Sequence, residues 1–264
     1  MLQNTMNINQ LQINVRKKVL EMVLRSREGH VASSFSILEI LIAIHKHLES
    51  LGATDKFCSH TILSKGHSVY ALYGLMSELG QLSDQDLAQV GQYGSYLIGH
   101  VPVRPEKNFF VGTGSLGQGF PMALGRAYIN VMRGDTVPQF VIVGDGEFNE
   151  GSCWETLMLM QKFPQCNLRV FIDNNHSSTR AIPMEQVFAS LKHTWKTVSV
   201  NGHNVDDILE ALALNNNKDN LIVLCDTKKG YPLQAMNNPM WHHRMPNAEE
   251  VSEFSAEIEQ YFGG

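Results

Sequence analysis

The feature that most constrains the fold is a set of short apolar runs, rich in Val, Ile and Leu, that alternate with helical patterns. Three of these runs, over 139–143, 168–172 and 221–225, indicate fully buried strands. Less apolar runs over 60–64 and 196–200 predict two more. Buried strands that alternate with helices are typical of a parallel sheet covered on both faces. We therefore expect an α/β fold with a doubly wound parallel sheet and helices on both faces.

Amphipathic spacing predicts the helices between and around these strands. They are expected over 11–27, 36–48, 66–79, 117–132, 150–162, 205–214 and 247–262, with a short capped helix after Ser83. No internal repeat and no long linker divides the sequence. We therefore expect a single domain over residues 1–264, with a short polar N-terminal arm at about residues 1–10.

The composition is that of an ordinary globular protein, with 43% hydrophobic residues and a net charge of −5. No block of like charge indicates a nucleic-acid or membrane surface. The apolar run over 37–44 contains Glu39 and is too short to cross a bilayer, and residues 1–12 lack the pattern of a signal peptide. The four cysteines lie far apart without a CxxC pair, which favours reduced thiols. We therefore expect a cytoplasmic protein with no nucleic-acid and no membrane partner.

Polar residues follow two of the buried strands at the point where each strand ends. Gly144-Asp145-Gly146 follows the first, and Asn174-Asn175 follows the second. Ligands of such sheets bind at the carboxyl ends of the strands. Asp145 and Asn175 offer hard oxygen ligands, which suit Mg²⁺ or Ca²⁺, and the two glycines let the backbone approach an anion. The helix that follows points its N-terminus to the same place, which favours phosphate.

This pair of segments, at this spacing, resembles the thiamine diphosphate motif. The resemblance implies that Asp145, Asn175 and the backbone carbonyl of Ser177 bind a cation, Mg²⁺ or Ca²⁺, that holds the diphosphate of the cofactor. It also implies that Asn175 lies beside the cofactor. Further cofactor contacts, or the dimer interface next to the cofactor, are implied for Gly144, Gly146 and Glu150.

Further segments along nearly the whole chain resemble transketolase. They are Glu28-Gly29-His30, Leu63-Ser64-Lys65-Gly66-His67, Gly99-His100, Gly112-Thr113-Gly114-Ser115-Leu116-Gly117-Gln118-Gly119, Lys229-Gly230-Tyr231 and Trp241-His242. The fold implied is the diphosphate domain of the thiamine diphosphate-binding fold. The resemblance implies that His67 contacts the diphosphate, and that the aminopyrimidine ring of the cofactor is lined by Gly114, Ser115 and Leu116.

The same resemblance places His30, His100 and His242 around the reacting carbon as catalytic residues, with His242 also touching the cofactor. Histidine suits this work because its ordinary pKa is near 6.5, so it donates or accepts a proton at neutral pH. His242 is preferred over His243 because it follows Trp241.

Three departures from the family pattern lie beside these residues. Val31-Ala32 follows His30 where the family has Pro-Gly, and Val101 follows His100 where an acidic residue is expected. Ser115 stands where full-length enzymes often have proline. We therefore expect ordinary chemistry on an unusual sugar.

The activity implied is that of the N-terminal subunit of a thiamine diphosphate-dependent transketolase. Such an enzyme moves a two-carbon ketol unit from a ketose or ketose phosphate to an aldose acceptor. The pyrimidine domain, which supplies the glutamate that activates the cofactor, has no counterpart in this sequence. We therefore expect a partner, the C-terminal transketolase subunit, in an α2β2 assembly that acts on sugars or sugar phosphates.

Three other functions remain open. Another thiamine diphosphate carboligase shares the cofactor motif: a 1-deoxyxylulose-phosphate synthase-like enzyme, or the alpha chain of a 2-oxoacid dehydrogenase. A non-catalytic subunit that only binds the cofactor is the alternative from another class. An ordinary dinucleotide-binding domain fits worst, because the glycine-rich segment 112–119 does not follow a long hydrophobic strand.

Overall fold

The computed structural model describes residues 7–177, 184–214 and 218–264. Within these ranges five strands form one sheet in which every pairing is parallel. In spatial order the strands are β1 (Thr61–Leu63), β2 (Gln139–Gly144), β3 (Leu168–Asn174), β5 (Leu221–Asp226) and β4 (Thr197–Asn201).

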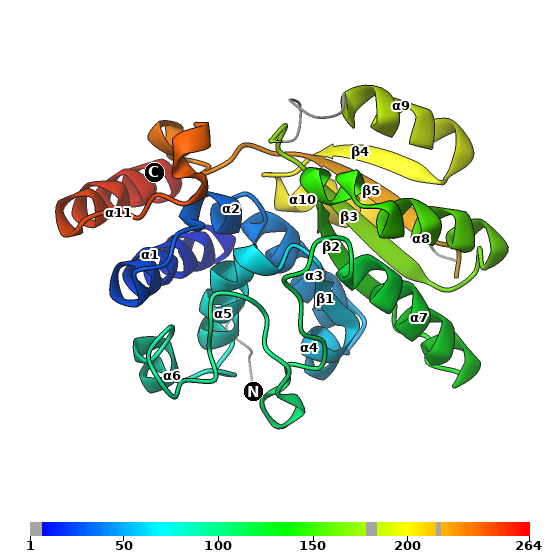
Figure 1. Ribbon diagram of the computed structural model, residues 1–264, viewed down its shortest axis with the longest axis horizontal. Coiled ribbons are helices and arrows are strands. Elements are labelled where there is room, and N and C mark those ends of the chain that lie inside the picture. The colour runs from blue at the N-terminus through cyan, green and yellow to red at the C-terminus, as the bar shows by residue number, and fades with distance from the viewer. Residues whose placement is uncertain (1–6, 178–183, 215–217) are drawn as a thin grey trace.

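Helices cover both faces of this sheet (Figure 1). One face is covered by α3 (Leu38–Ser50), α5 (Val69–Glu78) and α10 (Val205–Ala213), and the other by α7 (Gly119–Met132), α8 (Gly151–Lys162) and α9 (Met184–Thr194). The alternating side chains of β2 show why. Phe140 and Ile142 enter the first core, whereas Val141 and Val143 enter the second. The expected doubly wound α/β fold is confirmed.

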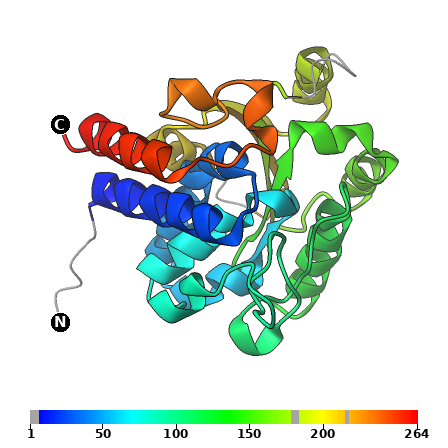
Figure 2. The ribbon, with the colours of Figure 1, turned by 60° about the vertical axis from the view of Figure 1, so that its left-hand side comes forward.

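Two long helices form a further layer beyond α5. Helices α1 (Ile8–Ser26) and α11 (Ala248–Phe262) lie side by side in both views (Figures 1 and 2). Between them and the sheet lies the apolar stretch Val31–Ser50, whose mean hydropathy is 1.3. Because 89% of its most apolar window is buried in the protein, this stretch is accounted for as core.

The structure differs from the expected elements in several places, including a short unexpected helix, α4 (Phe57–His60), directly before β1. The helix expected over 36–48 is preceded by a separate short helix, α2 (Val31–Phe35), because the backbone of Ile37 is not helical. Helix α9 was not expected, although its apolar residues Met184, Val187, Phe188 and Leu191 follow the i, i+3, i+4, i+7 spacing of an amphipathic helix. Helix α1 begins at Ile8, within the arm expected at about residues 1–10, of which residues 1–6 lie outside the described residues.

The register of the strands decides where the polar residues meet. Gly144 on β2 pairs with Asp173 on β3, and Asp173 pairs with Cys225 on β5. The carboxyl ends of these three strands are therefore level, and β1 ends beside them. Residues that follow the four strands face one edge of the sheet, where parallel α/β folds bind their ligands.

Candidate cofactor and active site

Three residues meet at the ends of β2 and β3, and we call Asp145, Asn175 and Ser177 the cation corner. The Ser177 amide donates to Asp145 Oδ2 at 2.8 Å, and its hydroxyl donates to Asp145 Oδ1 at 3.0 Å. The same amide lies 3.1 Å from Asn175 Oδ1. Asn175 Nδ2 donates to Asp173 at 2.8 Å, which turns its oxygen towards Ser177. The structure thus brings together the three residues predicted to bind a cation.

The donor set of the cation corner fits a hard divalent cation. A carboxylate and an amide oxygen are ligands that Mg²⁺ and Ca²⁺ prefer. Asp145 is 1% exposed and Asn175 is 8% exposed, so both are fixed in place. The Gly146 amide, expected to face the diphosphate, donates here to Asp145 Oδ1 at 2.8 Å, and the Gly144 amide donates to Glu147.

A buried ion pair that the sequence reasoning missed supports this corner. Lys65 follows β1 and pairs with Asp173 at the end of β3, with 4% and 0% of the two side chains exposed. Thr227 and Ser36 also donate to Asp173. Burial alone would raise the pKa of Asp173, but Lys65 and these hydrogen bonds hold it below its ordinary value. The sequence signal for this ion pair was a charged residue at the end of each of two predicted strands, Lys65 at one and Asp173 at the other.

Glu147 is a second buried carboxylate with no predicted role. Its oxygens accept hydrogen bonds from Ser64 Oγ at 2.6 Å, from the Gly144 amide at 2.8 Å and from the Gly117 amide at 3.0 Å. Burial nevertheless raises its pKa above the ordinary value. Glu147 therefore ties the ends of β1 and β2 to the glycine-rich segment 112–119.

Five histidines gather beside the cation corner, and we call His30, His67, His100, His242 and His243 the histidine cluster. The ring of His30 is central. Its centroid lies 4.9 Å from that of His67, 5.4 Å from His242, 4.7 Å from His243 and 6.4 Å from His100. The backbone of His30 is left-handed, with φ at 73°, and the residue directly precedes α2. The three histidines predicted to be catalytic therefore converge with the one predicted to touch the diphosphate.

The surroundings keep the imidazoles of His30, His67 and His242 neutral near pH 7. Burial, followed by the neighbouring histidines and Lys229, lowers the pKa of His30 to about 4. Burial and Lys229 lower the pKa of His242 to about 4, and burial with Lys65 holds the pKa of His67 well below its ordinary value. His30 Nδ1 is buried and has no hydrogen-bond partner among the described residues. Neutral rings with available nitrogens both donate and accept protons.

Lys229 follows β5 and is a further residue of the site that the sequence reasoning missed. Its ammonium lies 2.9 Å from His242 Nδ1, and burial, aided by Lys65, lowers its pKa to about 8. This contact distinguishes the two adjacent histidines. His242 is half-buried, contacts Lys229 and lies 5.8 Å from His67, whereas His243 is exposed. Both rings nevertheless reach His30.

The glycine-rich segment borders the cluster on one side. A Cβ atom on Gly114 would lie 3.1 Å from His100 Cδ2, so the backbone passes directly against that ring. Ser115 and Leu116 are exposed at the rim. Gly117, with φ at 73°, packs against the side chain of Glu150. Glu150 is itself exposed and is not part of the histidine cluster, which leaves it accessible to another chain.

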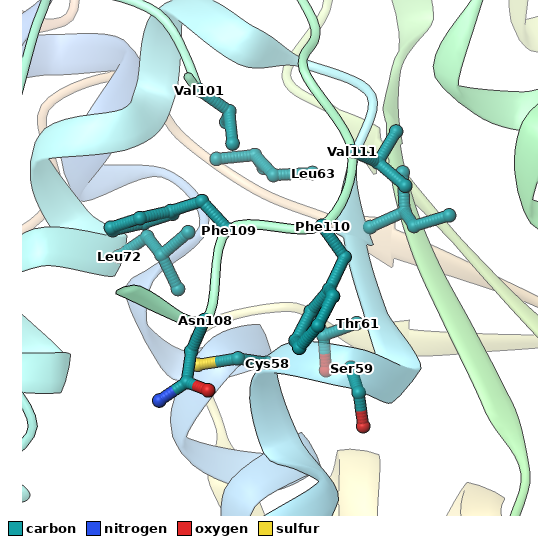
Figure 3. A pocket seen from close by; sticks show the side chains of 11 residues that line it. Cys58, Ser59, Thr61, Leu63, Leu72, Val101, Asn108, Phe109, Phe110 and Val111 are labelled. Atoms are coloured by element: carbon teal, nitrogen blue, oxygen red, sulfur yellow. The ribbon is translucent and has the colours of Figure 1, made fainter. Parts of the chain in front are cut away.

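Two hollows lie in this part of the molecule. The larger, of about 390 Å³, is lined by Glu28, Gly29, His30, Ile98, Gly99 and His100. The smaller lies beside residues 108–111 (Figure 3) and holds about 20 Å³, room for one water molecule. Its walls are mostly apolar, and burial raises the pKa of its Cys58 thiol to about 12. Of these two hollows, only the larger presents side chains that were predicted to be catalytic, those of His30 and His100.

Known proteins resemble this chain in sequence and in fold. The family described as "Transketolase, thiamine diphosphate binding domain" matches residues 8–258. The chain is 29% identical to an apulose-4-phosphate transketolase subunit from Phocaeicola vulgatus, over 93% of this chain and 91% of that one. It is 32% identical to a 6-deoxy-6-sulfo-D-fructose transketolase subunit from Clostridium sp., over 90% of both chains.

Solved structures show the same fold. A transketolase from Leishmania mexicana superposes with a TM-score of 0.79 at 21% identity, over 97% of this chain and 41% of that chain. The subunits named above match over about nine-tenths of both lengths, so this chain is a transketolase subunit of the split kind. On its sequence match and its fold, the chain belongs to the transketolase family and contains that family's thiamine diphosphate-binding domain.

Proposed function

We propose that the chain is the N-terminal half of an enzyme that transfers a two-carbon ketol unit from a ketose to an aldose. The observation that carries the proposal is the convergence of His30, His67 and His242 beside the cation corner. Thiamine diphosphate supplies the electron sink that cleavage of a carbon–carbon bond requires. His30, His100 and His242 hold the hydroxyl and carbonyl oxygens of the sugar and exchange protons with them.

A divalent cation, Mg²⁺ or Ca²⁺, is part of the proposal. Asp145 and Asn175 offer its protein ligands, and the carbonyl of Ser177 is the third ligand suggested by the family resemblance. The cation would balance the charge of the diphosphate. Buried Lys65 pairs with Asp173 and so balances the negative charge of that carboxylate beside the corner.

The substrates we propose are sugars with an anionic group. The names of the two relatives contain a sugar phosphate and a sulfo sugar. The hollow beside His30 and His100 presents two imidazoles and Glu28, which suit the hydroxyl-bearing end of a sugar. The anionic group would then lie away from Glu28, whose carboxyl group lines that hollow.

We further propose a partner chain with a pyrimidine domain and an assembly of two copies of each chain. The chain corresponds to 41% of the Leishmania transketolase, and a second chain would supply the rest. Exposed apolar side chains on α7 and α8 support contacts with other chains: Met122, Ile129, Met132, Met158 and Leu159. The four cysteines are free thiols, which supports a cytoplasmic location.

Reconstitution tests the proposal. The chain is assayed with thiamine diphosphate, Mg²⁺, a ketose phosphate donor and an aldose acceptor, with and without a pyrimidine-domain chain encoded beside its gene. We expect turnover only with both chains, and a molar mass by light scattering that equals two of each. Pyruvate replaces the ketose in a parallel assay. Turnover by this chain alone, or pyruvate as the preferred donor, would contradict the proposal.

A further inference from the structure

Three members of the histidine cluster are arranged as metal ligands. His30, His242 and His243 each bring one ring nitrogen to within 4.8 Å of the other two. Their ring centroids lie 5.4, 4.7 and 4.5 Å apart in pairs. A tetrahedral Zn²⁺ ion with Zn–N distances near 2.0–2.1 Å holds its nitrogens about 3.3 Å apart. Small rotations of the side chains therefore bring these three nitrogens to ligand spacing.

Of the three ligands, His243 is the unexpected one. The family resemblance gives roles to His30 and His242 but none to His243, which is exposed and next to His242 in sequence. A second observation points to a metal ion. The Nδ1 atom of His30 is buried without a hydrogen-bond partner among the described residues. His30 therefore has a buried ring nitrogen without a partner and lies within ligand spacing of two more imidazoles, an arrangement that a metal ion completes.

We propose that His30, His242 and His243 bind a divalent transition-metal ion such as Zn²⁺, with solvent or a ligand in the fourth position. Imidazole nitrogen is preferred by Zn²⁺ and similar ions, whereas Mg²⁺ prefers oxygen. The oxygen ligands of the cation corner and this nitrogen site therefore select different metals. The two sites are able to hold their ions at the same time.

Occupancy of this site blocks the enzyme. The ion engages the lone pairs of His30 and His242, which the proposed ketol transfer needs for the sugar. This consequence rests on the proposed function, whereas metal binding itself does not. A ketose donor and the ion compete for the same imidazoles, so each weakens the binding of the other.

Lys229 opposes the ion. Its ammonium lies 2.9 Å from His242 Nδ1, and an ammonium only donates, so it engages the lone pair of that nitrogen and leaves the ring proton on Nε2. Its positive charge also repels a cation. The ion must therefore displace Lys229 or the proton of the ring. Lys229→Met removes both obstacles and should tighten Zn²⁺ binding by about 10-fold or more, since like charges at close range repel strongly in a partly buried site.

Metal titration of the purified chain tests the site without any activity. ZnCl₂ is titrated against the chain by calorimetry in excess MgCl₂. We expect one Zn²⁺ per chain in the wild type and a loss of more than about 100-fold in affinity in His243→Ala, because even second-shell changes cost a metal site 10–100-fold. His193→Ala on the exposed part of α9 is the matched control and should bind as the wild type does.

Wild-type affinity in His243→Ala, or competition between Mg²⁺ and Zn²⁺, would overturn the inference, since the ion would then lie elsewhere or at the cation corner. Because His243 is exposed, its replacement does not disturb the core. Weaker binding in Lys229→Met would contradict the role of Lys229.

The reconstituted enzyme tests the inhibition separately. Zn²⁺ should inhibit the wild-type pair, a saturating ketose donor should protect it, and a chelator should restore turnover. The same Zn²⁺ should inhibit the pair that carries His243→Ala much less. If reconstitution yields no turnover with any ketose, the proposed function fails while the calorimetric result still decides the metal site.

Discussion

The cation corner and the histidine cluster lie at the same edge of the sheet, yet they are built in opposite ways. In the cation corner, Asp145 accepts bonds from Ser177 and Gly146, and Asn175 is anchored to Asp173. In the histidine cluster, His30 keeps a buried nitrogen without a partner among the described residues. The difference separates two tasks. The corner is pre-organised to hold charge, and the cluster keeps ring nitrogens available to act on a ligand.

The cation corner should be the more sensitive of the two for cofactor binding. Asp145→Ala removes the anionic ligand and should abolish Mg²⁺-dependent binding of thiamine diphosphate, because the diphosphate charge is then uncompensated. Asn175→Ala should have the same effect. Calorimetric titration with Mg²⁺ and cofactor measures it. Asp206→Ala, which removes an exposed carboxylate from α10, is the control. Undiminished affinity in both corner variants would refute the assignment of the cation corner.

The histidine cluster should be the more sensitive of the two for turnover. In the reconstituted enzyme, His30→Ala should lower kcat by about 10²–10⁴-fold, the usual contribution of a positioned acid or base. Its cofactor affinity should change far less. His242→Ala should behave in the same way, whereas His67→Ala should act mainly on cofactor affinity. Steady-state kinetics beside cofactor titration separates the two effects, and an unchanged kcat in His30→Ala would remove that residue from catalysis.

The ion pair beneath the corner should matter for folding. Lys65→Met leaves Asp173 charged and buried without its partner, which should lower the free energy of unfolding by about 3–5 kcal/mol. Lys56→Met is the matched control, because Lys56 pairs with Asp135 at the partly exposed surface, where such pairs contribute about 1 kcal/mol or less. Urea denaturation followed by circular dichroism measures both. Equal losses in the two variants would show that the buried pair has no special role.

The two regions also differ in how far the sequence predicts them. Asp145 and Asn175 directly follow two strands with clear apolar runs, and the carboxyl ends of parallel strands lie at one edge of the sheet, so the sequence alone predicts that both face that edge. The histidines come from segments as distant as Glu28-Gly29-His30 and Trp241-His242, in loops whose course depends on tertiary packing. The periodicity of apolar residues does not predict that these histidines converge. Their convergence was inferred only from the resemblance to a family.

The residues missed have a common physical reason. Lys65, Asp173 and Lys229 act on one another through space, across β1, β3 and the loop after β5. Each stands in a segment whose pattern was read for a neighbouring residue, such as His67 or Asn175. A charge at the end of a buried strand was a visible signal, but its partner depends on which strands are adjacent. The spatial order of the strands, β1-β2-β3-β5-β4, cannot be predicted from the local sequence.

The smallest effect expected is a pH dependence of stability that belongs to the histidine cluster. Burial first, and then neighbouring positive groups, lower the pKa of His30 and His242 to about 4 in the folded protein, against about 6.5 in the unfolded chain. Between these values the unfolded chain binds more protons than the folded one. Stability therefore rises with pH in this window, and it is lost as the pH falls from about 6.5 towards 4.

We expect the free energy of unfolding to fall by less than about 1.4 kcal/mol per pH unit for each of the two histidines, since both rings are partly solvated and screened. Urea denaturation between pH 7 and pH 4.5 measures the slope. The double variant His30→Asn, His242→Asn removes both titrating rings and should flatten it. His193→Asn should leave the slope at the wild-type value, because that side chain is exposed on α9. A slope that survives in the double variant would assign the acid sensitivity to groups other than these two histidines.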